Sequence, residues 1–195
     1  MLLGNLGLLR QDPMAFAEVL LATAIGLLIA ITFHEVSHGL AAAALGDDTA
    51  RRQGRLSLNP LVHLEPVGAI LLFLVGFGWG KPVPVNPYNL RGGERRGMAL
   101  VALAGPASNL LLAAIFALPL RFNMELAPML LATIVLLNIL LAVFNLFPIP
   151  PLDGYRIAVG LLPRAAAFPL SRLETYGPAL LIGVLLLDSL SGVSL

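Results

Sequence analysis

The sequence predicts an all-α polytopic membrane protein with about four transmembrane helices, a re-entrant segment and a short β-like edge. The first observation behind this prediction is composition: of 195 residues, 58% are hydrophobic and 12% are charged, and the mean hydropathy is +0.89. Soluble domains have about 45–50% apolar and about 25% charged residues. A net charge of +1 gives no reason to expect a nucleic-acid partner, and a chain without cysteine has no thiolate metal ligands.

The second observation is a set of uncharged runs long enough to cross a bilayer, which requires about 20 apolar residues in a helix. The first run reaches this length once its helix continues through His34–His38 to Leu45. The last run reaches it if its helix extends towards Leu190. The four runs are Val19–Phe33, Gly97–Leu120, Leu126–Leu152 and Thr175–Leu187.

A fifth run, Pro66–Gly80, is predicted to enter and leave the membrane on one side. It is short, begins with proline and ends in Gly76-Phe77-Gly78-Trp79-Gly80, and glycines at this density stop a helix. A re-entrant segment places ten of the 12 basic residues on one face, with Arg10 and Arg121 on the other. Because a full crossing would divide them more evenly, the positive-inside rule favours re-entry, with the basic face cytoplasmic.

The first span contains the motif His34-Glu35-Val36-Ser37-His38. Residues i and i+4 of a helix share a face, so both imidazoles can hold one metal ion. Glu35 lies beside them, where it can accept a proton from a metal-activated water. Ionisable residues inside a span are costly and usually functional. The alternative is that the two histidines hydrogen-bond neighbouring helices.

Asp153 is the candidate for a third ligand, since a catalytic zinc usually has three protein ligands and one open position. It precedes Gly154 and follows Pro148, Pro150 and Pro151, which should end the preceding helix. An unpaired carboxylate at this depth would be costly, and a bound cation would remove that cost. The alternative is a helix cap at the membrane surface.

These motifs together resemble the site-2 protease family of intramembrane zinc metalloproteases. The resemblance rests on HExxH at His34–His38 and on the pattern NxxPxPPLDG at Asn145–Gly154. Gly105–Asn109 resembles the family's GPxxN helix, and Arg55–His63 and Lys81–Val85 resemble its compact prokaryotic members without PDZ or CBS domains.

The resemblance implies roles for individual residues. His34, His38 and Asp153 match the ligands of one zinc ion per chain, Glu35 matches the general base, and Asn145 matches an asparagine that holds the substrate backbone. With the chain's length, it implies that residues 1–195 form a single membrane-embedded metalloprotease domain.

The expected function is therefore intramembrane proteolysis: hydrolysis of peptide bonds in or near transmembrane segments of membrane proteins. The partners would be transmembrane substrates and the lipid bilayer, in the cytoplasmic membrane, with the active site towards the cytoplasmic side. The alternative is a membrane metal transporter or metal-binding protein. A transporter does not need glutamate beside the first ligand and tends to have repeated halves, which this sequence lacks.

Substrate binding is predicted at an extended edge, because a transmembrane helix must unwind before its peptide bonds become accessible. Strand addition can satisfy the unwound backbone. The candidate edge is Gly80–Val85, where Val83 and Val85 favour an extended chain and Pro82 and Pro84 confine pairing to one side.

Three further polar residues have structural interpretations first. Asn109 and Asn138 are expected to make interhelical hydrogen bonds, with substrate binding as a weaker alternative for Asn109. His63 is expected at the surface or as the anchor of a loop, with an additional ligand or a gate as the alternative.

Overall fold

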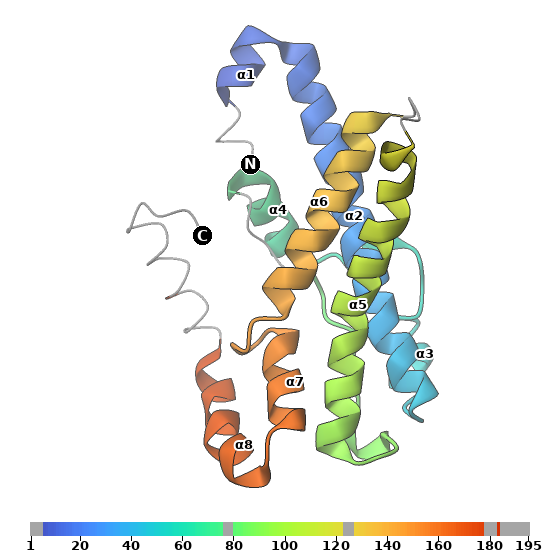
Figure 1. The fold of residues 1–195 in the computed structure, drawn as a ribbon, viewed down its shortest axis with the longest axis vertical. Helices are drawn as coiled ribbons and strands as arrows, with labels where there is room; N and C mark the ends of the chain where they lie inside the picture. The colour runs from blue at the N-terminus through green and yellow to red at the C-terminus, as the bar shows by residue number, and fades with distance from the viewer. Residues whose placement is uncertain (1–5, 76–79, 123–126, 178–182, 184–195) are drawn as a thin grey trace.

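The computed structural model describes residues 6–75, 80–122, 127–177 and 183, and over these residues it is mostly helical with no sheet. Within these described ranges, three helices are long and apolar enough to cross a membrane: α2 (Pro13–Ala44), α5 (Glu94–Arg121) and α6 (Pro128–Asn145). They pack against one another as a three-helix bundle (Figure 1). These helices account for three of the four predicted spans, and the fourth, Thr175–Leu187, lies largely outside the described residues.

The shorter elements lie around this bundle. Two of them, α4 (Pro66–Val75) and α7 (Asp153–Leu161), bear on the candidate site, and α8 (Arg164–Ser171) packs against α7 (Figure 1). The remaining elements are α1 (Leu6–Gln11), α3 (Thr49–Arg52), η2 (Pro60–Val62), η3 (Pro87–Asn89) and η4 (Arg172–Tyr176).

The helix α2 carries the HExxH motif and begins with a well-formed N-terminus. The Asp12 side chain accepts hydrogen bonds from the backbone N–H groups of Met14 and Ala15, and Pro13 occupies the first helical position. At about 1.5 Å per residue, 32 residues extend over about 48 Å. This length exceeds the hydrocarbon core of about 30 Å, so α2 can cross it and continue beyond it.

A buried amide network joins the three long helices. Asn109 on α5 donates from Nδ2 to the carbonyl oxygen of Ala30 on α2 (3.0 Å) and to Oδ1 of Asn138 on α6 (2.8 Å). Asn138 donates in turn to the Ile134 carbonyl within its own helix. Both side chains are completely buried. The interhelical hydrogen bonds predicted for these two asparagines are confirmed.

The residues just before and just after the segment that contains α4 lie next to each other. Ten helical residues extend over only about 15 Å, which is too short to cross the hydrocarbon core. Leu64 and Gly80 form an isolated antiparallel bridge, and Lys81 N–H donates to the His63 carbonyl at 2.7 Å. This pairing is the geometry expected of a re-entrant segment. The glycine-rich stretch predicted to stop the helix falls mainly on residues 76–79, outside the described residues.

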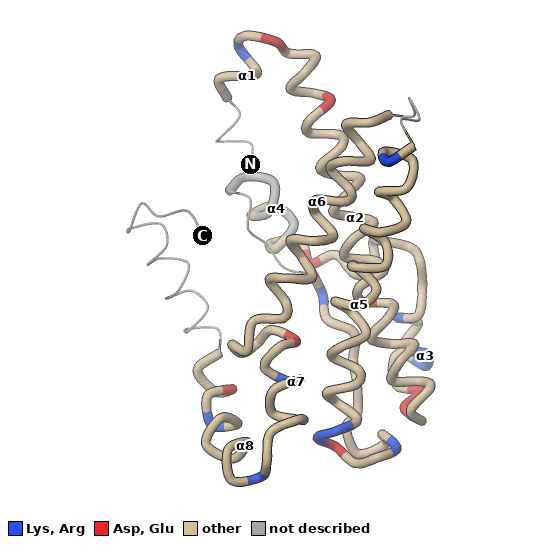
Figure 2. Tube along the Cα trace, in the orientation of Figure 1, with Lys and Arg blue, Asp and Glu red and all other residues tan. Residues whose placement is uncertain are grey.

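Long stretches of α2, α5 and α6 contain no charged residue, and charged residues lie at both ends of the bundle and at mid-height beside these stretches (Figure 2). Arg10 and Arg121 lie near the same end, because α2 and α5 run in opposite directions (Figure 1). The sequence predicted that these two arginines share the face with few basic residues.

Candidate metal centre

Three side chains from two distant parts of the chain converge inside the bundle. His34 and His38 lie one turn apart on α2, and Asp153 is the first residue of α7. His34 Nε2 lies 3.0 Å from His38 Nε2, and Asp153 Oδ2 lies 3.1 Å and 3.2 Å from these two nitrogen atoms. The two histidines are only 5% and 9% exposed. The structure therefore brings together all three residues that the sequence predicted as ligands.

Each histidine ring is oriented by a hydrogen bond from its other nitrogen to α5. His34 Nδ1 lies 2.6 Å from Asn109 Oδ1, and His38 Nδ1 lies 2.7 Å from the Val101 carbonyl oxygen. Since Asn109 uses Nδ2 as a donor to Ala30 and Asn138, its Oδ1 must accept from His34. When both rings are neutral, as metal binding requires, the proton of each ring is therefore on Nδ1 and each Nε2 atom presents a lone pair.

The converging atoms fit a bound cation. Two unprotonated imidazole nitrogens and a carboxylate oxygen face one another, and Asp153 Oδ2 is buried without a hydrogen-bond donor among the described residues. Such a set of acceptors repels itself unless a cation lies between them. Two ligands at about 2.05 Å from a tetrahedral zinc lie about 3.3 Å apart, close to the observed 3.0–3.2 Å. The residues thus fit zinc in donor type and in spacing.

Gly105 provides the space for both imidazoles against α5. A Cβ atom at this position would lie 2.5 Å from Cε1 and Nε2 of His38 and 2.7 Å from Cε1 of His34. Any larger residue would displace the two rings. The sequence marked Gly105 only as part of the segment that resembles the GPxxN helix, because the position of the rings depends on how α2 and α5 cross.

Asp153 is placed by the abrupt change of direction between α6 and α7. The helix α6 ends at Asn145, before the first proline, as the sequence predicted. Gly154 then lies directly against the backbone of Leu146 and Phe147, where a Cβ atom would clash. Leu152, rather than Asp153, occupies the N-cap position, and no side chain caps the helix. The alternative of Asp153 as a helix cap is therefore not what the structure shows.

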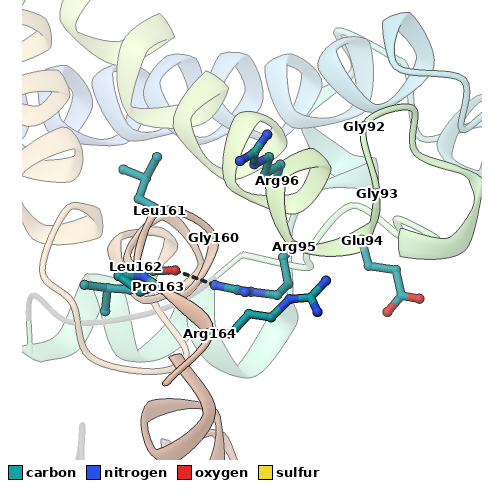
Figure 3. A pocket seen from close by; sticks show the side chains of 10 residues that line it. All are labelled: Gly92, Gly93, Glu94, Arg95, Arg96, Gly160, Leu161, Leu162, Pro163 and Arg164. Carbon is teal, nitrogen blue, oxygen red and sulfur yellow. Dashed lines mark hydrogen bonds between the residues drawn. The ribbon is translucent and has the colours of Figure 1, made fainter. Parts of the chain in front are cut away.

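Arg95 fixes the other end of α7. It reaches from the first turn of α5 and donates through Nη2 to the carbonyl oxygen of Val159 (2.6 Å). The same atom donates to the carbonyl oxygen of Leu162 (2.7 Å; Figure 3). The pocket at this junction is lined by residues 92–96 and 160–164 and includes none of the converging ligands. The contact ties α7 to α5, the helix that also orients both histidines.

Glu35 is half-buried and bonded to the segment that follows the α4 region. Its Oε2 accepts a hydrogen bond from the Val83 backbone N–H at 2.9 Å. Sequence reasoning missed this contact, because it assigned the Val83 backbone to substrate pairing. It also missed the His38–Val101 bond, since a backbone carbonyl leaves no signal in the sequence.

The other predicted residues lie in different surroundings. Asn145 is half-buried and donates to the Leu141 carbonyl of its own helix at 2.9 Å. Asn109 is completely buried within the bundle, where it supports His34. His63 does not lie on the surface: it is fully buried, and its Nε2 lies 2.8 Å from the Ser57 carbonyl, which makes it a loop anchor.

Membrane-length helices around a buried His–His–Asp set, with glutamate beside the first histidine, define the class of membrane-embedded metallopeptidases. Comparison with known proteins supports this class. Residues 122–187 match the model of peptidase family M50. The chain is 41% identical over 176 residues to "Putative zinc metalloprotease YwhC" of Bacillus subtilis. This match covers 85% of this chain and 78% of that protein. The chain therefore belongs to peptidase family M50, the site-2 protease family of membrane zinc metalloproteases.

Mycobacterial relatives are more distant and longer. "Putative zinc metalloprotease Rip2" of Mycobacterium tuberculosis H37Rv is 32% identical over 154 residues, and its counterpart in Mycolicibacterium smegmatis is 31% identical over 150 residues. These matches cover 74% and 73% of this chain but only 58% of each relative. No solved structure matches the chain.

Proposed function

We propose that this membrane zinc metalloprotease is an intramembrane endopeptidase that hydrolyses peptide bonds in or near the transmembrane segments of membrane proteins. The observation that supports this most directly is the depth of the site. His34 and His38 are buried in the longest apolar helix of the described residues, and Asp153 reaches them from the first position of α7. A peptide bond must therefore come to a site surrounded by transmembrane helices.

In this proposal His34, His38 and Asp153 hold one zinc ion per chain, and residues 1–195 act as a single membrane-embedded domain. Zinc, when bound, supplies a Lewis acid and lowers the pKa of a coordinated water from 15.7 to about 7. Glu35 accepts the proton from the attacking water and donates it to the leaving amine. Asn109 and the Val101 carbonyl hold the two imidazoles in the tautomer that this chemistry requires.

The substrate would be an unwound stretch of a transmembrane helix. In lipid, the freed N–H and C=O groups need partners, and the proposed sources are the Asn145 amide and the backbone groups of the Gly80–Val85 edge other than the Val83 N–H, which is bonded to Glu35. Substrates with Gly, Pro or Asn near the scissile bond should then be cleaved faster than leucine-rich ones, because less free energy is needed to open their helices.

We also propose that the protein lies in the cytoplasmic membrane with the site towards the cytoplasmic side. The paired ends of the α4 segment support a topology in which ten basic residues share one face. The positive-inside rule then assigns that face to the cytoplasm.

The test is the Glu35→Gln variant in purified full-length protein with a model transmembrane substrate. Turnover should fall by at least about 10²–10⁴-fold, because the proton acceptor is lost, while the zinc stoichiometry measured by mass spectrometry stays the same. His34→Ala and Asp153→Ala should lower the stoichiometry itself. Normal cleavage by Glu35→Gln would contradict the mechanism. Zinc uptake into vesicles that persists in this variant, without cleavage, would support the transporter instead.

A further inference from the structure

The segment of residues 80–86 lies along α2, over the same stretch that carries the HExxH motif. At its start, Gly80 lies so close to Ile31 that a Cβ atom would be 3.1 Å from Ile31 Cγ2. At its centre, Val83 contacts Glu35 and lies against Gly39. At its end, the Asn86 N–H donates to the buried carboxylate of Asp47 at 2.7 Å. The segment therefore follows α2 from before His34 to beyond His38.

Between Lys81 and Val85 the sequence of this segment leaves few backbone donors, and two of them donate to other parts of this chain. Pro82 and Pro84 have no N–H. The Lys81 N–H donates to the His63 carbonyl (2.7 Å) and the Val83 N–H donates to Glu35 Oε2 (2.9 Å). The acceptor of the first donor is a loop carbonyl and the acceptor of the second is a side chain of α2, so both donors are used within the protein. The Val83 N–H is thus not free to pair with a substrate strand.

Arg55 holds the same segment at the preceding peptide by a short hydrogen bond, and the Pro82–Val83 peptide by a longer one. This arginine is buried, and its Nη2 donates to the carbonyl oxygens of Lys81 (2.6 Å) and Pro82 (3.4 Å). The Pro82 carbonyl and the Val83 N–H belong to one planar trans peptide and point in opposite directions. The negative end of this peptide dipole meets a guanidinium and its positive end meets a carboxylate, so both contacts orient it in the same sense.

We propose that the Pro82–Val83 peptide, held by Arg55, is the positioning group for the Glu35 carboxylate. It fixes Oε2, and it leaves Oε1, for which the described residues provide no hydrogen bond, to receive the proton from water. The inference rests on the proposed role of Glu35 as the proton acceptor. It assigns the segment a role in the chemical step, in addition to any role of its outer side in substrate binding.

Amide hydrogen exchange tests the contact without any measurement of activity. Within residues 81–85 only Lys81, Val83 and Val85 have exchangeable backbone amides, so the individual signals can be separated. In the zinc-loaded full-length protein, Glu35→Ala should accelerate exchange at Val83 by about tenfold or more. Lys81 should keep its rate, because its acceptor is the His63 carbonyl. An unchanged rate at Val83, or equal acceleration at both residues, would overturn the proposal.

Kinetics then separate positioning from substrate binding. Arg55→Met should lower kcat about tenfold or more with little change in KM, because a displaced base affects the chemical step. Arg55→Lys should restore part of kcat, since it retains a charged donor. The matched control is Arg52→Met, which removes an exposed arginine three residues earlier. A rise in KM with unchanged kcat in Arg55→Met would overturn the positioning role.

A failure of this inference is distinguishable from a failure of the proposed function. If Glu35→Gln retains full turnover, the role of Glu35 as proton acceptor is wrong, whatever the exchange data show. If Glu35→Gln is inactive but Val83 exchange does not respond to Glu35→Ala, only the positioning role is wrong.

Discussion

Replacement of Gly105 by alanine should damage the metal centre through a single added methyl group. That group would lie 2.5 Å from two atoms of the His38 ring and 2.7 Å from one atom of the His34 ring. Ordinary contacts between such atoms are about 3.5–4.0 Å, so the rings must move by about 1 Å. Metal–ligand distances vary by only about 0.2 Å in well-formed sites. The required displacement is therefore about five times the tolerance.

The rings have little freedom to move away. Asn109 and the Val101 carbonyl hold them on α5, the same helix that carries the added methyl group. We expect zinc affinity to fall by at least about 100-fold, which is the upper end of the loss when a supporting hydrogen bond is removed, or about 2.7 kcal/mol. Alanine is favoured over glycine within a helix by about 0.5–1 kcal/mol, so α5 itself should still form.

The assay is competition for zinc between the purified protein and a chelator of known affinity, with metal content measured at equilibrium. Gly7→Ala is the matched control, because a Cβ atom at that helical glycine meets nothing within 4 Å. Circular dichroism reports whether the helices are retained. Wild-type zinc affinity in Gly105→Ala would refute the inference that these two imidazoles hold the metal.

Three further predictions follow from other contacts. Asn109→Leu removes the acceptor for His34 Nδ1–H and should weaken zinc binding about 10–100-fold; unchanged affinity in the chelator assay would show that this hydrogen bond does not orient the ring. Burial would raise the pKa of Asp47, but the hydrogen bonds that it accepts outweigh burial and hold the pKa below its usual value of 3.8. Since the folded pKa is lowered, this stabilisation is complete above about pH 4–5 and is lost as the pH falls through the folded pKa. The difference in Tm between wild type and Asp47→Asn should therefore shrink on acidification, and a constant difference would exclude the linkage. Single cysteines at the exposed positions of Arg52 and Arg91 should both be labelled from the cytoplasmic side, and labelling from opposite sides would show that the α4 segment crosses the membrane.

The sequence predicted the long helices well, because the physical requirement behind them is local. A backbone in lipid must satisfy its hydrogen bonds within its own segment, so uncharged runs of membrane length mark α2, α5 and α6. The run Leu126–Leu152 overestimated its helix, which occupies only Pro128–Asn145. Uncharged residues near Pro148 belong instead to the turn that delivers Asp153, and hydropathy alone does not separate the two.

For the site, the sequence predicted which side chains come together, and the tertiary structure decided how they are held. His34 and His38 share a face because of the helical repeat, which is a property of five consecutive residues. Their supporting contacts join residues 75 and 63 positions apart, and the bond between Glu35 and Val83 joins residues 48 positions apart. A backbone carbonyl or N–H is present at almost every residue, so nothing in the sequence marks the one that reaches the site. Only the packing of α5 and of residues 80–86 against α2 selects Val101 and Val83, because hydrogen bonds of about 3 Å depend on the relative placement of whole elements.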